Sequence, residues 1–316
     1  MQLLPPHFFY LAPIRGVTDA LFRRVFNAHF PGFDAAVAPF ISPQRFTSLK
    51  PLMLADILPE NNTTLPTVPQ LLYNRADDFI TLGRLLTDLG YSHLNWNLGC
   101  PAPQVANKGR GSGLLENPRK IVDILETVHS QLDTQISLKT RLGFRSAYDL
   151  DRLLPGLEGF PLKEIVVHPR IGKQLYRGKA DHNAFDRCRD LTGHTLVYNG
   201  DIRTPADFFE LSTRFGNIHR WMIGRGALAD PLLLEKIAGK EPEHAEAAER
   251  IREFHDELYT RLEQRLHGPG HLLGRMKQIW AYLIGSFPGR EKSLKKIHKA
   301  RTTIGYLKEA AKIFSK

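Results

Sequence analysis

Cys100, one of only two cysteines in the chain, lies between Gly99 and Pro101 directly after a short apolar run. An unperturbed thiol has a pKa of about 8.5, so at neutral pH it is protonated and can donate a proton. The ordinary alternative for such a cysteine is a small buried apolar residue. No metal-ligand spacing surrounds it, which argues against zinc, and a nucleophilic pair with His168 has no local support. These residues favour proton donation.

Polar and glycine residues also end other short apolar runs. Lys139 would be a buried cation and needs an anionic partner, either an internal carboxylate or the edge of a flavin that gains negative charge on reduction. Asn199-Gly200-Asp201 and Gly224-Arg225-Gly226 expose backbone N–H groups in turns, which suits a phosphate; the alternative is two ordinary turns that need glycine. The full set is Gln70, Asn97, Cys100, Lys139, Arg141, His168, Arg170, Asn199, Gly200, Asp201, Gly224 and Arg225.

Eight apolar or β-branched runs alternate with segments whose apolar residues recur at helical spacing. Eight such units within about 235 residues predict a (β/α)8 barrel with its active site at the carboxyl ends of the strands; a doubly wound open sheet is the alternative. The predicted strands are 8–13, 33–39, 67–72, 93–97, 135–139, 164–168, 195–199 and 220–223. The predicted helices between them are 77–89, 118–132, 147–157, 180–191 and 205–215. Pro118 after Asn117 and Pro205 after Thr204 are typical of a capped first turn.

The strand pattern stops near residue 240, and three helical stretches follow at 245–265, 270–283 and 291–314. We therefore predict two domains, a catalytic barrel over 1–240 and a small helical bundle over 241–316. From Arg250 to Lys316 there are 15 Lys or Arg and 6 Asp or Glu, which accounts for nearly all of the net charge of +10. A basic appendage on a nearly neutral body indicates a polyanionic partner, although a solvated basic face is the common alternative.

Composition narrows the class of protein. The chain of 316 residues is 42% hydrophobic and 24% charged, as in globular proteins. Two cysteines exclude a disulfide scaffold and a multi-thiolate metal site, and they fit a reducing cytoplasm. The segment Met1–Pro6 has no signal-peptide pattern, and no apolar run is long enough to span a bilayer. We expect a cytoplasmic monomer without a metal.

Ordered motifs along the chain resemble those of the tRNA-dihydrouridine synthases, a family of FMN enzymes. The resemblance covers about Leu11 to Leu234 and continues more weakly into the helical tail. The matching motifs are Ala12-Pro13-Ile14-Arg15-Gly16-Val17-Thr18-Asp19 with Phe22-Arg23, Asn97-Leu98-Gly99-Cys100-Pro101, residues 108–118, Ser137-Leu138-Lys139-Thr140-Arg141-Leu142-Gly143, Val167-His168-Pro169-Arg170 with Gln174, Tyr176, Gly178 and Ala180-Asp181, Asn199-Gly200-Asp201-Ile202, and residues 223–228.

The resemblance implies a mechanism. NADPH would reduce FMN, a uridine would be flipped out of folded tRNA, hydride would pass to uracil C6, and Cys100 would protonate C5. It implies that FMN is held by Ala12, Pro13, Ile14, Gln70, Asn97, Lys139, His168, Asn199, Gly200, Asp201, Gly224 and Arg225. It also implies base or tRNA contacts by Arg141, Arg170, Gln174 and Tyr176. The basic tail, with Arg275, Lys277, Lys295, Lys296 and Lys299, would bind the tRNA backbone.

Some motifs depart from the family pattern. Ile14 stands where methionine is frequent, Tyr73 where glycine is, and Pro169 where glycine follows the histidine. Residues 275–283 resemble the tail of the bacterial C-type subgroup, which implies position 16 of the D-loop as the target. A dihydroorotate-type dehydrogenase for free pyrimidines, a non-catalytic RNA-binding protein on a barrel, and a ribosomal RNA substrate remain alternatives.

Overall fold

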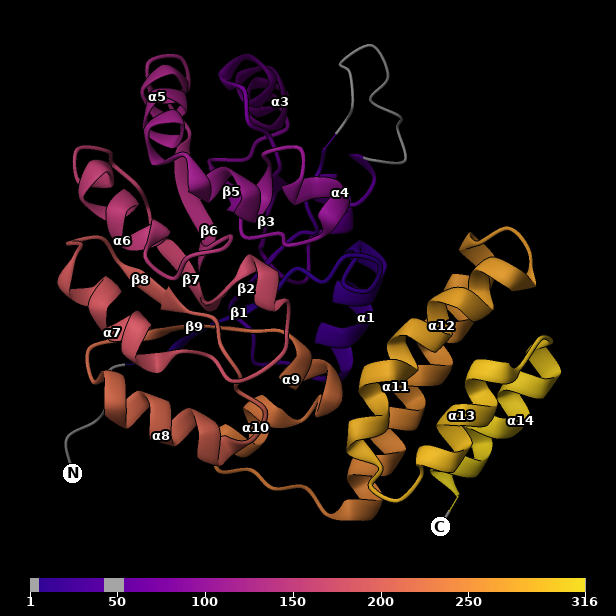
Figure 1. Ribbon diagram of the computed structural model, residues 1–316. Helices are drawn as coiled ribbons and strands as arrows, with labels where there is room; N and C mark the ends of the chain where they lie inside the picture. The colour runs from indigo at the N-terminus through magenta and orange to yellow at the C-terminus, as the bar shows by residue number, and fades with distance from the viewer. Residues whose placement is uncertain (1–5, 43–53, 316) are drawn as a thin grey trace.

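A computed structural model describes residues 6–42 and 54–315 (Figure 1). Residues 1–5, on which the expectation about a signal peptide mainly rests, lie outside this range. A parallel sheet forms the centre of the larger domain, with strands in the order β3-β2-β1-β9-β8-β7-β6-β5-β4. The strands are β1 (Phe8–Leu11), β2 (Ala35–Val37), β3 (Thr67–Val68), β4 (Gln70–Leu71), β5 (His93–Leu98), β6 (Gln135–Gly143), β7 (Ile165–Ile171), β8 (Leu196–Tyr198) and β9 (Arg220–Ile223).

The sheet closes on itself at Pro69. Strands β3 and β4 are two halves of one extended run, of which β3 pairs with β2 and β4 pairs with β5. Proline has no N–H to donate, so it interrupts the run, while its carbonyl still accepts from the Asn95 backbone nitrogen at 2.9 Å. The result is the predicted eight-stranded barrel and not the open sheet.

The strand predictions are correct in number and order but too short for two strands. The predicted strand 135–139 continues to Gly143 in β6, and the predicted strand 164–168 continues to Ile171 in β7. Arg141 and Arg170 therefore lie within strands and not in the loops beyond them. Both arginines are consequently buried, at 2% and 1% exposure.

Helices surround the barrel, and the predicted caps begin two of them. The Asn117 side chain accepts from the Lys120 backbone nitrogen at the start of α5, and Thr204 and Asp207 form a capping box at the start of α8. The barrel helices are α1 (Ala20–His29), α3 (Ala76–Asp88), α4 (Pro103–Ala106), α5 (Pro118–His129), α6 (Asp149–Leu153), α7 (His182–Asp190), α8 (Pro205–Phe215), α9 (Arg225–Ala229) and α10 (Leu233–Ile237).

Alternation along the strands produces two apolar layers. One side chain set lies between the strands and the helices and forms the large outer core. The other faces the barrel axis and comes from β1, β2, β3, β7, β8 and β9. Its buried members are Tyr10, Ala12, Ala35, Val37, Val68, Val166, Val197 and Met222. The inward positions of β4, β5 and β6 are polar instead, and they lead to the site described below.

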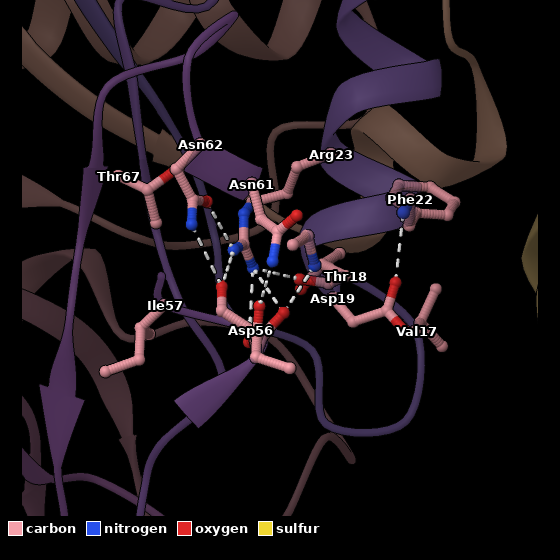
Figure 2. A network of polar contacts seen from close by, with 12 residues as sticks. Val17, Thr18, Asp19, Phe22, Arg23, Asp56, Ile57, Asn61, Asn62 and Thr67 are labelled. Atoms are coloured by element: carbon pink, nitrogen blue, oxygen red, sulfur yellow. Dashed lines mark hydrogen bonds and ion pairs between the residues drawn. The ribbon is translucent and has the colours of Figure 1, made fainter. Parts of the chain in front are cut away.

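A polar network ties the start of α1 to the segment before β3 (Figure 2). The guanidinium of Arg23, only 1% exposed, donates to the backbone oxygens of Thr18 and Asp56 at 2.7 Å each. It also donates to the Asn62 side chain at 2.7 Å and pairs with the Asp56 carboxylate at 3.4 Å. These contacts of its two terminal nitrogens fix the chain immediately after the loop 12–17 at the carboxyl end of β1.

Four helices follow the barrel, and we call them together the helical domain: α11 (His244–Arg265), α12 (Pro269–Leu283), α13 (Glu291–Lys299) and α14 (Thr303–Phe314). The prediction of one helix over 291–314 was wrong. The backbone at Ala300 is extended, and the Thr302 hydroxyl caps a new helix by accepting from the Gly305 nitrogen. The break lets α13 and α14 lie against each other, and both lie on the outer side of α11 and α12 (Figure 1).

The helical domain packs on α1 and α9 of the barrel. The ring of Phe254 on α11 lies edge-on against Phe22 and Phe26 of α1, at centroid distances of 5.7 and 5.8 Å. Nearby, Arg250 pairs with the Glu235 carboxylate and donates to the His29 backbone oxygen at 2.9 Å. The interface therefore has a buried aromatic centre with ion pairs beside it.

Candidate active site

A cavity of about 260 Å3 opens at the carboxyl ends of the strands. Larger hollows, of about 700, 680, 570 and 350 Å3, share no lining residue with it. We place the site in the smaller cavity because titratable groups from several strands converge there. Its lining residues are Pro13, Ile14, Arg15, Pro39, Phe40, Gln70, Asn97, Gly99, Cys100, Pro101, Lys139, Arg141, His168, Tyr176 and Tyr282.

A ladder of side-chain amides inside the barrel supports the cysteine loop. Asn97 accepts from the backbone nitrogens of Gly99 and Cys100, at 3.1 and 2.8 Å. Its own amide nitrogen donates to Gln70 at 2.8 Å, and Gln70 in turn donates to Asn95 at 2.7 Å. Asn95 completes the ladder by donating to the Ser137 hydroxyl at 2.8 Å. Two of the predicted cofactor residues, Gln70 and Asn97, thus fix the turn that carries Cys100.

Gly111 and Ser112, in the 3-10 turn that begins at Gly111, also contact Cys100. Gly111 has a φ of +54°, and a Cβ there would lie 2.6 Å from the Cys100 carbonyl oxygen, so this position requires glycine. Ser112 donates to the same oxygen from its backbone nitrogen and its hydroxyl, both at 3.1 Å. Burial raises the pKa of the Cys100 thiol, against smaller lowering effects from the Ala102 backbone and nearby cations. The thiol is therefore neutral at physiological pH.

The ammonium of Lys139 faces the cavity without a counter-ion. No hydrogen bond or ion pair joins it to any residue within 6–42 and 54–315, so an internal carboxylate does not neutralise it. Burial, followed by repulsion from Arg141, lowers the pKa of Lys139 to about 7. An anionic or hydrogen-bond-accepting ligand in the cavity would favour the charged form.

Arg141 connects the cysteine loop to the loop after β7. Its guanidinium donates to the Gly99 oxygen at 3.1 Å and to the oxygens of Ile171 and Leu175 at 3.0 and 2.7 Å. Leu175 has a φ of +54°, a rare conformation for a residue other than glycine. The next residue, Tyr176, is 54% exposed at the cavity mouth, and its ring lies 5.3 Å from the Arg141 guanidinium carbon.

His168 is held in one neutral form. A guanidinium can only donate, so the 3.0 Å contact between Arg170 and His168 makes Nε2 of the imidazole the acceptor and leaves its proton on Nδ1. Burial and three neighbouring arginines and Lys139 lower the pKa of His168 well below its ordinary value. Because His168 lines the cavity, it can present a neutral N–H donor there.

Arg170 itself does not line the cavity. It pairs with Asp201 and donates to the Gly178 oxygen at 2.7 Å, so it is used within the protein. Arg225 pairs with the other oxygen of Asp201 at 2.8 Å and lies 4.4 Å from the Tyr176 ring centroid. Asp201 is therefore the common carboxylate that positions two arginines beside the mouth.

Five predicted cofactor residues follow β8 or β9 and do not line the cavity: Asn199, Gly200, Asp201, Gly224 and Arg225. The Asn199 amide donates to the Met222 oxygen at 2.7 Å and joins β8 to β9. A Cβ on Gly200 would overlap the Tyr198 hydroxyl, and one on Gly224 would lie 3.2 Å from the Ala12 side chain. Of the first loop, Pro13 and Ile14 line the cavity and Ala12 does not.

Several predicted tRNA-contacting residues make internal contacts instead. Gln174 donates to the backbone oxygens of Arg177 and Lys179, which folds its own loop. Arg275 binds the loop after β1, through Asp19 at 2.6 Å, and Lys277 donates to the Ala300 oxygen at 2.6 Å. In contrast, the side chains of Lys295, Lys296 and Lys299 are exposed on α13.

Six lining residues are not among the predicted site residues: Arg15, Pro39, Phe40, Gly99, Pro101 and Tyr282. Arg15 follows β1, and Pro39 and Phe40 follow β2. The guanidinium carbon of Arg15 lies 5.3 Å from the Phe40 ring centroid. Their position directly after a strand could have identified Arg15, Pro39 and Phe40 from the sequence. Tyr282 comes from α12 of the other domain, and no local signal in the sequence indicates that a tail helix reaches the cavity.

Comparison with known proteins decides the family. Residues 10–314 match the dihydrouridine synthase family. The chain belongs to this family. The "Probable tRNA-dihydrouridine synthase" of Rhodobacter capsulatus is 31% identical over 239 residues, which is 75% of this chain and 72% of that protein. The "Probable tRNA-dihydrouridine synthase 2" of Bacillus subtilis is 27% identical, over 84% of this chain and 83% of that protein.

Solved structures of other proteins share the fold of this family member. Morphinone reductase superposes with a TM-score of 0.54 at 10% identity, over 77% of this chain and 90% of that one. The old yellow enzyme from Trypanosoma cruzi gives 0.53 at 9% identity, over 75% and 89%. At such identities the likeness shows the fold alone. Within the described residues, no helix is long and apolar enough to cross a membrane, and no group of His, Cys, Asp or Glu could hold a metal ion.

Proposed function

We propose that this dihydrouridine synthase family member uses FMN and NADPH to reduce the C5–C6 double bond of a D-loop uridine in cytoplasmic tRNA. One observation carries the proposal: the neutral thiol of Cys100 and the amino group of Lys139 face the same cavity. A proton donor and a cation beside it are the groups that reduction of an activated double bond requires.

The residues present fit a flavin. The Lys139 ammonium and the N–H of His168 offer a cation and a neutral donor to the ring edge that gains charge on reduction. Gly200 has no room for a side chain and Gly224 has little, and Arg225 lies beside them, which would suit the phosphate group. Ala12, Pro13, Ile14, Gln70, Asn97, Asn199 and Asp201 would complete the FMN site by shape and by fixing these groups. Bound FMN, reduced by NADPH, would supply the hydride that adds to uracil C6.

The chain's own residues would perform the other half of the reduction. Cys100 donates a proton to C5, and its raised pKa keeps that proton on sulfur until C5 becomes basic. The Asn97 and Ser112 contacts hold the thiol in place, and Lys139 stabilises negative charge that develops toward the C4 oxygen. Arg141 excludes water by closing the gap between the cysteine loop and the β7 loop.

A uridine inside folded tRNA must leave its stack to enter the cavity, at a cost of a few kcal/mol. The exposed ring of Tyr176, held between Arg141 and Arg225, offers a stacking surface at the mouth. Arg170 and Gln174 support this loop from within. Lys295, Lys296 and Lys299 on α13 would bind the phosphate backbone together with other basic residues of the tail. Position 16 as the target is supported by the resemblance of residues 275–283 to the C-type tail.

The test uses purified protein, NADPH and unmodified tRNA, with dihydrouridine detected by mass spectrometry. We expect bound FMN, and a Cys100→Ala variant that keeps FMN and tRNA affinity but turns over about 10²- to 10⁴-fold more slowly. Cys188→Ala, at a buried cysteine of α7, is the matched control and should stay active. Protein without flavin would favour a non-catalytic RNA-binding role. Reduction of free pyrimidines in preference to tRNA would favour a dihydroorotate-type dehydrogenase, and full activity of Cys100→Ala would refute the proton-donor role.

A further inference from the structure

Tyr282 brings the helical domain into the catalytic cavity. It lies near the end of α12, and its side chain lines the same cavity as Cys100 and Lys139. No hydrogen bond joins its hydroxyl to another residue of the described ranges, and its exposure is intermediate. Its neighbours Trp280 and Leu283 on the same helix are 0% and 1% exposed and provide the packing within the helical domain. Tyr282 itself packs only partly against that core, and it also lines the cavity.

The position of α12 is fixed against the loop after β1. Arg275 donates to the backbone oxygens of Gly16 and Val17 and pairs with Asp19. One turn later, the Gln278 side chain approaches Gly16 so closely that a Cβ on this glycine would lie 3.1 Å from it. The spacing 275, 278, 282 places these three side chains on one face of the helix.

The contacts of Arg275 and Gln278 with the loop after β1 fix the position of Tyr282 relative to the barrel. The loop that Arg275 holds also carries Pro13, Ile14 and Arg15, which line one side of the cavity. Ser286, just beyond α12, donates to the Ala229 oxygen of α9 at 2.7 Å. Contacts at both ends of the helix segment therefore leave little freedom for Tyr282 to move away from the cavity.

We propose that Tyr282 is a substrate-positioning residue that contacts the flipped uridine, so that the helical domain supplies part of the catalytic site. This rests on the proposed function. Burial, and then the nearby Tyr176, raise the pKa of the Tyr282 phenol, so it is a neutral donor and acceptor at physiological pH. Such a group suits a pyrimidine carbonyl or a ribose hydroxyl, and its ring suits contact with the base.

Three full-length holoenzymes test this: Tyr282→Ala, Tyr282→Phe, and the control Tyr148→Ala, at a tyrosine that is 58% exposed and does not line the cavity. For each we would measure FMN content, the rate of flavin reduction by NADPH without tRNA, the Kd for tRNA, and kcat/KM for dihydrouridine formation. Tyr282→Ala should lower kcat/KM about 10- to 100-fold, the effect of losing one base contact. Tyr282→Phe should lower it about 3- to 10-fold, the effect of losing one hydrogen bond.

The other readouts separate positioning from packing. The Kd for tRNA should change less than about threefold, because backbone phosphates dominate affinity. FMN content and flavin reduction should match wild type in all three variants. A Tyr282→Ala enzyme within twofold of the wild-type kcat/KM overturns the proposal, as does a parallel loss of FMN or of flavin reduction. A wild-type enzyme that forms no dihydrouridine refutes the proposed function itself, and the role of Tyr282 falls with it.

Discussion

Replacing Lys139 with methionine should stabilise the flavin-free protein and weaken its affinity for FMN. Methionine keeps most of the side-chain length and removes the charge. In the flavin-free protein the ammonium faces the cavity without a counter-ion from residues 6–42 or 54–315, so the charge costs stability there. Once an electron-rich ligand is bound, the same charge becomes favourable. The substitution Lys139→Met should therefore be favourable for the flavin-free protein and unfavourable for the FMN-bound protein.

The magnitude follows from the pKa. Burial and Arg141 lower the pKa of Lys139 from 10.5 to about 7, while in the unfolded chain it returns to the higher value. Between these values the unfolded state binds more protons, so stability rises as pH increases from about 7 to 10.5. The penalty is fully present below the folded pKa. At 1.36 kcal/mol per pKa unit it is at most about 5 kcal/mol, and we expect about 2–3 kcal/mol because water can enter the cavity.

Urea unfolding of the flavin-free proteins at two pH values provides the assay. At about pH 6.5 Lys139→Met should exceed wild type by about 2–3 kcal/mol, and at about pH 9.5 the gap should fall below about 1 kcal/mol. The control Lys163→Met, at an exposed residue just before β7, should show no such dependence on pH. Fluorescence titration should show an FMN Kd about 10- to 100-fold higher for Lys139→Met.

Two results would refute this reasoning. A Lys139→Met protein less stable than wild type at about pH 6.5 would mean that the ammonium is satisfied within the protein. An unchanged FMN Kd would mean that the ammonium does not face the ligand. Either result alone removes the basis for placing the charged edge of a flavin beside Lys139.

Two further predictions concern the helical domain. Tyr306→Phe should cost about 1–3 kcal/mol of stability, because the buried Trp280 N–H loses its acceptor at 2.8 Å; an unchanged urea midpoint would contradict this. Neutralising Lys295, Lys296 and Lys299 together should weaken tRNA binding at low salt and reduce the salt slope by up to about three, with FMN content unchanged, as measured by filter binding. Equal affinity of this triple variant and wild type across salt concentrations would show that α13 does not face the RNA.

The sequence was sufficient for the barrel and for the centre of the site because both depend on local patterns. The apolar runs were visible as strands, and Gln70, Asn97, Cys100, Lys139 and His168 were predicted together because the ends of parallel strands meet at one edge. All five line the cavity. Their individual partners could not be predicted, because the amide ladder depends on register between strands far apart in the sequence.

The remaining differences have nonlocal causes. Strand β7 runs past its predicted end, so Arg170 is buried against Asp201 and does not reach the cavity. The break between α13 and α14 follows from the cap at Thr302. The apolar residues recur at helical spacing on both sides of this threonine, so the periodicity alone does not reveal the break. Tyr282 reaches the cavity only because of how α12 docks on the barrel, and no short segment of sequence encodes that angle.

The hydrogen bonds of the amide ladder all run in one direction, which is set at the end next to the cysteine loop. Backbone nitrogens of Gly99 and Cys100 can only donate, so the oxygen of Asn97 must face them and its nitrogen must face Gln70. The same constraint then orients Gln70 toward Asn95. No single side-chain amide of the ladder can rotate by 180° without placing two oxygens or two NH2 groups in contact. A substitution at Gln70, Asn95 or Asn97 should therefore be tolerated only when the neighbouring amides are also replaced. We expect these three positions to vary together among related sequences.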